Sequence, residues 1–409
     1  MKGRLVGLLK LLFVAALMWF VFRTIHFEDR LVYRSGAPDQ QVVSEERIVE
    51  IQGTWKDDPV RYTEGGDPTV REAASGPQPD GRTLEIAPGF LTYWRNLDPL
   101  LFALGALCYF VTVLIAGARW WWLLRVNGTD VSLNETLRFT WIGVFFNTVV
   151  PGATGGDVIK AIYIMKRCPG HRVQVLVSVI VDRVLGLASL ALLGAVVVLF
   201  ALDRFGDIAL AIWAVIVGVG LIGLVAFSRR LRQLVRLKWL LERLPHKLSH
   251  LLKLVDQAVF FYRDHRIVIA ASLLAGVGNH VISVLSVVCV GHALGVGMPS
   301  FEYFVLIPVI NIVTAVPIGP NGWGVGETLY KLLFGKYGAA HLPGVANAAE
   351  AMGTRGVALS VLYRLHLTFW SLLGGLFVLF EKDKVTRADI EHEVELEERD
   401  DVDPPAARS

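Results

Sequence analysis

Cysteine is scarce in this chain, and the short motifs of soluble catalysis are missing. The 409 residues contain three cysteines, Cys108, Cys168 and Cys289, without the spacing of metal ligands. The sequence therefore indicates neither a disulfide framework nor a zinc site. A phosphate-binding loop of the form G-x-x-x-x-G-K-[ST], a nucleophile elbow and an H-E-x-x-H sequence are also absent. We therefore expect no nucleotide-driven pumping, no cofactor, no metal and no enzyme activity of these kinds.

Long apolar runs are abundant instead. Hydrophobic residues make up 54% of the chain and the mean hydropathy is +0.50, which exceeds what soluble globular proteins carry. A helix that crosses the hydrocarbon core of a bilayer needs about 20 such residues. The sequence predicts an all-α polytopic membrane protein with about six full transmembrane helices. The clearest apolar runs are Leu5–Phe22, Leu100–Ala118, Val173–Leu202, Ile208–Phe227, Ile267–Gly291 and Val357–Phe380.

The distribution of charge predicts the orientation of these helices, because basic residues favour the cytoplasmic side. Basic residues precede the first run, so residues 1–23 are expected to be a retained anchor with a cytoplasmic N-terminus. Residues 24–97 hold 13 acidic and 8 basic residues and should face outward. Residues 229–266 hold 10 basic and 3 acidic residues and should be a cytoplasmic amphipathic segment. Residues 383–409 are expected to be a disordered acidic tail, also cytoplasmic, of a protein of the inner (cytoplasmic) membrane.

The expected outer segment has the alternating pattern of β-strands. Residues Glu46–Ile51 and Arg82–Ala87 alternate apolar with polar side chains, and Gly and Pro turns lie between them. These features predict a small β-rich extracytoplasmic insertion. Two interpretations stay open: a tolerated insertion, or a lid that gates a substrate site.

The first unusual helix is interrupted by glycine and proline. An apolar stretch at 137–150 runs into Asn147-Thr-Val-Val-Pro-Gly-Ala-Thr-Gly-Gly-Asp157. If this stretch crossed the bilayer fully, the basic residues from Lys160 to Arg172 would lie outside, against the charge rule. A re-entrant hairpin that turns at 151–156 keeps them in the cytoplasm, whereas an ordinary extramembrane loop does not.

A second interruption runs from Asn311 to Glu327 and again contains Gly and Pro. Because the last span should end in the cytoplasm, this hairpin has to open toward the face opposite to that of the first hairpin. The helices that follow the two hairpins are also similar, since Ser178-Val-Ile-Val-Asp-Arg183 aligns with Ser360-Val-Leu-Tyr-Arg364 after a one-residue insertion. Opposite entry and internal similarity together predict an inverted repeat, in which broken helices line the substrate path.

Two arginines lie inside apolar runs. Arg183 is ten residues past Val173, or about 15 Å along a helix, and a central charge costs about 2.5–3.5 kcal/mol on insertion scales. One interpretation is a structural ion pair, for example Asp182 with Arg364. The other, which the nearby glycine-rich helix starts favour, is an anion site where Arg183, Arg364 and Lys160 hold a lipid phosphate.

Two other polar features are expected to be structural. Arg119 and Arg125 should close the second span on the cytoplasmic side, where the adjacent Trp120-Trp-Trp122 reads as an interfacial aromatic belt. Asn279-His280, within a later span, is expected to form an interhelical hydrogen bond.

At these residues the chain resembles the lysylphosphatidylglycerol synthase transmembrane-region family, whose members are described as flippase-like. The resemblance covers about residues 98–382 and rests on three ordered motifs. The first motif is Asn147, Pro151, Gly152, Gly155, Gly156, Asp157 and Lys160; the second is Ser178, Asp182, Arg183 and Gly186; the third, looser, is Pro317, Gly319, Gly322, Gly324 and Glu327. The resemblance implies movement of phospholipids or polyprenyl-linked glycolipids between leaflets. Bifunctional relatives add an aminoacyl-transferase domain, which is not seen before Ser409, so we do not expect synthase activity.

The sequence thus favours a lipid translocase for an anionic phospholipid or polyprenyl-linked glycolipid. Two alternatives stay open: a non-transporting scaffold or regulator of envelope biosynthesis, and a membrane-surface lipid group transferase. The expected partner is a membrane lipid with an anionic headgroup, not nucleic acid, and a second copy of the chain or an envelope-biosynthesis protein is left open. The residues expected to bind the headgroup are Asn147, Gly152, Gly155, Gly156, Asp157, Lys160, Ser178, Asp182, Arg183, Asn311, Pro317, Gly319, Gly324, Glu327 and Arg364.

Overall fold

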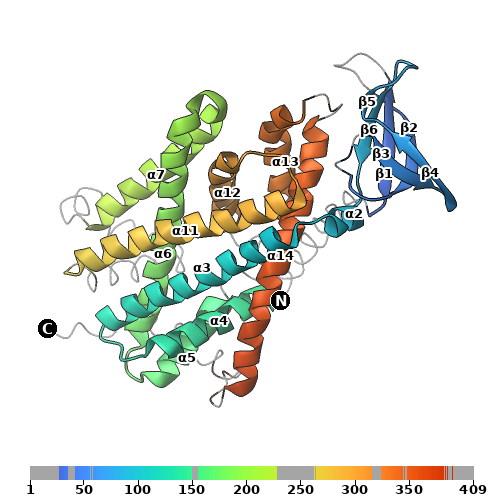
Figure 1. The fold of residues 1–409 in the computed structure, drawn as a ribbon. Coiled ribbons are helices and arrows are strands. Elements are labelled where there is room, and N and C mark those ends of the chain that lie inside the picture. The colour runs from blue at the N-terminus through green and yellow to red at the C-terminus, as the bar shows by residue number, and fades with distance from the viewer. Residues whose placement is uncertain are drawn as a thin grey trace, which may run out of the picture. The chain divides into compact units, whose positions relative to one another are not determined.

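A computed structural model describes most of the chain (Figure 1). The described residues are 27–35, 42–149, 155–227, 262–315 and 324–381, apart from 56, 58, 263, 344, 346 and 347, together with 383, 385 and 389. The chain forms two compact units. Unit 1 comprises Met1–Tyr109 and Val284–Leu367, and unit 2 comprises Phe110–Ser283 and Thr368–Ser409. The expected first span Leu5–Phe22, nearly all of the amphipathic segment 229–266 and most of the acidic tail lie outside the described residues.

Unit 1 begins with an antiparallel sheet of six strands in the order β4-β3-β2-β1-β6-β5. The alternating pattern predicted two of these strands correctly, since Glu46–Ile51 lies in β2 and Arg82–Ala87 coincides with β6 except at its first residue. The central strand β1 pairs with β2 on one side and with β6 on the other. The strands are β1 (Asp29–Ser35), β2 (Val42–Ile51), β3 (Val60–Glu64), β4 (Asp67–Ala73), β5 (Gly76–Pro77) and β6 (Thr83–Ala87).

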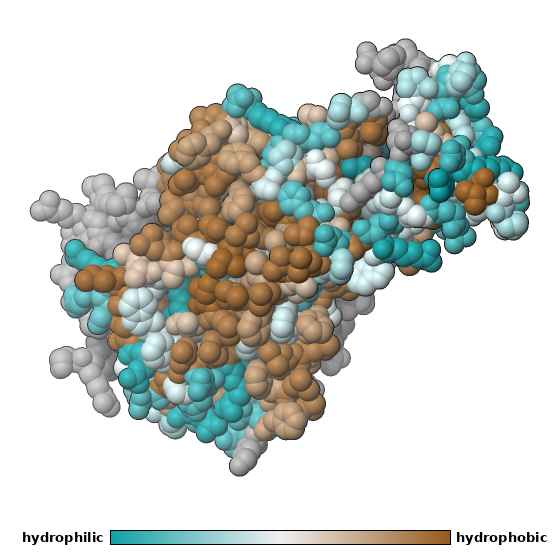
Figure 2. All heavy atoms as spheres, viewed as in Figure 1, coloured by the Kyte–Doolittle hydropathy of each residue, from teal (hydrophilic) through white to brown (hydrophobic). Residues whose placement is uncertain are grey.

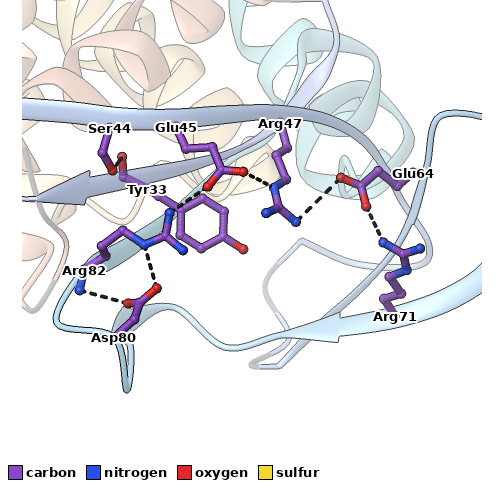
Figure 3. Close-up of polar contacts among 8 residues, drawn as sticks. All are labelled: Tyr33, Ser44, Glu45, Arg47, Glu64, Arg71, Asp80 and Arg82. Carbon is purple, nitrogen blue, oxygen red and sulfur yellow. Dashed lines mark hydrogen bonds and ion pairs between the residues drawn. The ribbon is translucent and has the colours of Figure 1, made fainter.

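One face of the sheet combines a small apolar core with a network of charges. Leu31, Val49, Tyr62 and Leu84 pack together. Farther along the strands, Glu45 accepts hydrogen bonds from Arg47 and Arg82, both at 2.6 Å, and Arg82 lies over the Tyr33 ring at 4.7 Å (Figure 3). These two hydrogen bonds lower the pKa of the Glu45 carboxyl. Because such exposed charges require water around them, the sheet is a solvated element.

A buried carboxylate connects the sheet to the helix that follows it, α2 (Phe90–Arg95). Asp29 is 5% exposed and accepts hydrogen bonds from the backbone N–H of Ile51 at 2.9 Å and of Gly89 at 2.6 Å. The Thr92 hydroxyl donates a third, at 2.8 Å. Three hydrogen-bond donors offset the cost of burying the Asp29 carboxylate. Because these donors come from the sheet and from the start of α2, Asp29 fixes where the chain leaves the sheet.

Helices make up most of the chain. They are α3 (Pro99–Val126), α4 (Leu133–Val149), α5 (Gly155–Arg167), α6 (Arg172–Val198), α7 (Leu202–Phe227), α11 (Arg266–Leu294), α12 (Ser300–Thr314), α13 (Val325–Gly338) and α14 (Ala348–Phe380), with short 3-10 turns at Leu199–Ala201 and Ala339–His341. Among the described residues, four helical stretches are long and apolar enough to cross a membrane: Pro99–Val126, Arg172–Leu210, Arg266–Leu294 and Ala348–Phe380.

These helices expose large apolar side chains. Ile267, Leu274 and Phe380 are 82%, 69% and 81% exposed, and hydrophobic residues cover most of the visible surface over the helices (Figure 2). Apolar patches of this extent are rare on soluble proteins. The fold is therefore that of a membrane protein with several apolar helices and a small antiparallel sheet near its N-terminus.

Two pairs of short helices form hairpins. In unit 2, the Cys168 thiol after α5 lies 3.5 Å from the Asp130 carbonyl before α4, so both helices have their open ends at the same place. In unit 1, His341 after α13 lies 2.6 Å from Glu302 at the start of α12. The tips of both hairpins, 150–154 and 316–323, lie outside the described residues.

We predict that Asp29→Ala loosens the sheet in the full-length protein. Loss of an acceptor shared by three donors should cost about 2–3 kcal/mol, so the Ile51 and Gly89 amides should exchange hydrogen roughly a hundredfold faster. Hydrogen–deuterium exchange with mass spectrometry measures this change. Asp80→Ala, which removes an exposed carboxylate, is the control and should leave both amides protected. Equal protection in the Asp29→Ala variant would contradict the role given to this residue.

Candidate functional site

The helices α4 and α5 of the first hairpin are in close contact. The Asn147 side-chain oxygen accepts a hydrogen bond at 2.9 Å from the backbone N–H of Gly156, in the first turn of α5. A Cβ atom on Gly156 would lie 2.0 Å from the Gly143 carbonyl oxygen. Only glycine permits this approach, and the approach positions the third residue of α5, Asp157.

Asp157 is the centre of a charged cluster within unit 2. Its carboxylate is 2.9 Å from the Lys160 ammonium and also pairs with the Arg183 guanidinium from α6. Lys160 in addition lies over the Trp120 ring of α3, 4.4 Å from the ring centroid. The side chains of Asp157 and Lys160 are both 9% exposed, whereas that of Arg183 is 51% exposed. Arg183 is therefore the accessible member of the cluster.

A second ion pair lies on the other side of α6. Arg119 of α3 binds Asp182 at 2.8 Å and also donates to the Asp182 backbone carbonyl at 3.2 Å. The structure thus corrects the example pairing of Asp182 with Arg364. Trp120, expected in an exposed interfacial belt, is instead buried: it is 1% exposed and donates to Ser178 at 3.1 Å.

The expected interhelical contact near Asn279-His280 is present at the histidine. His280 of α11 lies with its Nε2 2.9 Å from the Gly186 carbonyl of α6. This contact joins two long helices of unit 2 one turn beyond the Arg119–Asp182 pair.

Unit 1 contains a comparable cluster at the start of α13. Gly324, which precedes the helix, has a φ of +82° that favours glycine, and its N–H donates at 2.6 Å to the Glu327 carboxylate. Glu327 is fully buried and pairs with Arg364 of α14, and the Ser360 hydroxyl lies 3.4 Å away. Each hairpin therefore has a carboxylate at the third residue of its second helix, paired with an arginine of the next long helix.

The predicted site residues fall into two groups, one in each unit. Asn147, Gly156, Asp157, Lys160 and Arg183 are brought together in unit 2, and Gly155 is the first residue of α5. Ser178 and Asp182 join this group through Trp120 and Arg119. Gly324, Glu327 and Arg364 are brought together in unit 1. Asn311 lies in the last turn of α12, and Gly152, Pro317 and Gly319 lie outside the described residues.

Arg119, Trp120 and Ser360 are the contacts that sequence reasoning did not assign to a site. For Ser360 a signal existed, because Ser360 aligns with Ser178 in the two similar helices. For Arg119 and Trp120 no such signal existed, because their contacts with Asp182 and Ser178 depend on the packing of α3 on α6.

The basic end of α5 lies beside the end of α14 within unit 2. Glu381, which follows α14 and is 6% exposed, lies 3.2 Å from Arg138 of α4 and 3.5 Å from Arg167 of α5. Lys166 pairs with Asp389 at 2.7 Å. The open end of the first hairpin and the end of the last long helix are therefore on one side.

Helices of membrane-spanning length and ion pairs between them define a polytopic membrane protein. Residues 89–374 match the family described as the lysylphosphatidylglycerol synthase TM region, and the chain belongs to this family. It is also 26% identical over 300 residues to a UPF0104 membrane protein of Pyrococcus horikoshii, a match that covers 68% of this chain and 85% of the relative. No solved structure matches the chain.

We predict that Gly156→Ala destabilises the first hairpin. The added methyl group would meet backbone at Gly143 and the Asn147 amide, neither of which can move without shifting α4, so the cost should be at least about 1–3 kcal/mol. A lower temperature of unfolding in detergent, followed by fluorescence-detected size exclusion, is the expected result. Gly278→Ala in α11 is the matched control, because no atom lies within 4 Å of its added Cβ. Equal stability of the two variants would refute the close contact.

Proposed function

We propose that this protein translocates an anionic phospholipid or polyprenyl-linked glycolipid between membrane leaflets. The headgroup passes the charged clusters of Asp157, Lys160, Arg183, Glu327 and Arg364 while the acyl or prenyl tails stay in the hydrocarbon core. The observation that carries the proposal is Arg183, a half-exposed guanidinium twelve residues into the apolar helix α6.

An arginine at this position requires an explanation. A charge within an apolar transmembrane helix is costly and is retained where it faces a polar path or a partner. Arg183 has a carboxylate partner, yet about half of its side chain remains exposed. A guanidinium has five N–H donors and binds phosphate oxygens in a bidentate manner. These properties suit a lipid phosphate better than a purely structural ion pair.

The hairpins support a re-entrant arrangement. The helices α4 and α5 have 17 and 13 residues, or about 25 and 20 Å, and α12 and α13 have 15 and 14 residues, or about 22 and 21 Å. Each is shorter than a hydrocarbon core of about 30 Å. We therefore propose two hairpins that enter from opposite faces as an inverted repeat.

The positive-inside rule assigns the faces in this proposal. The basic end of α5 is cytoplasmic, and the end of α14 beside it places the C-terminus there too. The charged sheet then lies on the extracytoplasmic side.

We predict that the wild-type protein flips fluorescent phosphatidylglycerol in proteoliposomes and that Arg183→Ala lowers the rate at least about tenfold. A change of that size corresponds to the loss of one charge-assisted hydrogen bond of about 1.5 kcal/mol or more. Dithionite quenching of the outer-leaflet probe gives the rate. Arg125→Ala is the matched control, because Arg125 has a similar side-chain exposure of 48% and pairs with Asp130 outside both clusters.

Three outcomes would count against the proposal. Equal flipping by wild type and Arg183→Ala would remove the site assignment. No flipping of several anionic lipids by either protein would favour the scaffold alternative. Recovery of chemically altered lipid from the vesicles would favour the group transferase.

We further predict that the open ends of the two hairpins lie on opposite sides of the membrane. In inside-out and right-side-out vesicles, a membrane-impermeant maleimide should label Ser132→Cys from the cytoplasmic side and Ser300→Cys from the outside. Labelling at Ala153→Cys and Pro320→Cys, at the tips, should likewise differ in side. Labelling of each pair from the same side would defeat the inverted arrangement. The protein into which each single cysteine is introduced lacks the native cysteines Cys108, Cys168 and Cys289.

A further inference from the structure

The two charged clusters are not balanced in the same way. In unit 2, Lys160 and Arg183 share the single carboxylate of Asp157, which leaves one positive charge in excess. In unit 1, the Glu327 carboxylate pairs with the Arg364 guanidinium.

In the part of the chain that the structure describes, neighbouring groups do not remove this difference. The adjacent ion pair of Arg119 with Asp182 is itself neutral. The hairpin tips at 150–154 and 316–323 contain no ionisable side chain in the sequence, so they add no charge to either cluster.

The clusters also differ in accessibility. The Arg183 side chain is 51% exposed, whereas that of Arg364 is 11% exposed and its partner Glu327 is fully buried. Glu327 is in addition held by the Gly324 N–H and lies beside the Ser360 hydroxyl. Opening the Glu327–Arg364 pair would leave a buried charge without a partner, which is costly. A ligand can reach Arg183 without breaking any such pair.

We infer that the unit 2 cluster is the primary binding site for one phosphodiester headgroup with a single net negative charge, and that the Glu327–Arg364 pair serves a later step of passage. This inference rests on the proposed function. A phosphatidylglycerol-type headgroup cancels the excess charge of Asp157, Lys160 and Arg183. A zwitterionic headgroup brings no net charge, so it leaves the excess in place and binds more weakly.

Binding and flipping measured on the same full-length variants test this division of roles. Native mass spectrometry of the detergent-purified protein, titrated with phosphatidylglycerol or phosphatidylcholine, gives the Kd. Arg183→Gln and Lys160→Gln should each raise the Kd for phosphatidylglycerol about tenfold or more. Arg364→Gln should leave this Kd within about twofold of wild type and yet abolish flipping. Arg183→Lys keeps the charge and should raise the Kd less than Arg183→Gln does, which separates electrostatics from misfolding.

The outcomes separate this inference from the proposed function. Equal loss of affinity in Arg183→Gln and Arg364→Gln, or equal binding of phosphatidylcholine and phosphatidylglycerol, would overturn the inference while flipping by the wild type still supports the function. A wild type that neither binds nor flips phosphatidylglycerol would overturn both. Displacement of phosphatidylglycerol by millimolar glycerol 3-phosphate would show that a free phosphate ester is the ligand, which would overturn the lipid assignment.

Discussion

Three arginines that lie within the apolar helices of this protein each meet a carboxylate. Arg119 meets Asp182, Arg183 meets Asp157 and Arg364 meets Glu327. In an apolar medium an unpaired charge would cost several kcal/mol, more than most single contacts contribute. These pairs join α3 to α6, α5 to α6, and α13 to α14. Pairing of charges is therefore the constraint that determines how the helices of each unit pack.

Close packing of the helices allows the charged side chains of these ion pairs to reach each other. Glycines at the contacts allow backbones to approach, as at Gly156 against Gly143 and at Gly374, where an added Cβ would lie 2.0 Å from the Trp141 carbonyl. Small residues at helix contacts are typical of membrane proteins, in which van der Waals packing replaces the hydrophobic effect between helices. The short helices α4 and α5 thereby hold Asp157 at a fixed depth in unit 2, where Arg183 can reach it.

The sequence predicted the secondary-structure elements better than it predicted which charged side chains pair with each other. The alternation of apolar and polar residues identified β2 and β6. It could not identify β4, because the side chains of β4 are nearly all exposed and do not alternate between buried and exposed. Neighbours on a helix point about 100° apart, which agrees with the contacts of adjacent Asp182 and Arg183 with α3 and α5, respectively. Which residue each one meets depends on helix packing, which no local pattern encodes. For that reason the suggested pair of Asp182 with Arg364 was wrong although every residue in it is part of a buried cluster.

The matching positions of Asp157 and Glu327 have a consequence for the proposed transport. Each is the third residue of its helix, where the helix dipole stabilises negative charge. The same location favours a phosphate, so in the proposed transport a lipid headgroup would share Arg183 with the Asp157 carboxylate rather than displace it. Because the headgroup adds to the unit 2 cluster, it compensates the excess positive charge of Lys160 and Arg183 while Asp157 keeps its partners. In the proposed transport this compensation lowers the barrier to passage, because the headgroup charge is not transferred unpaired from water into hydrocarbon.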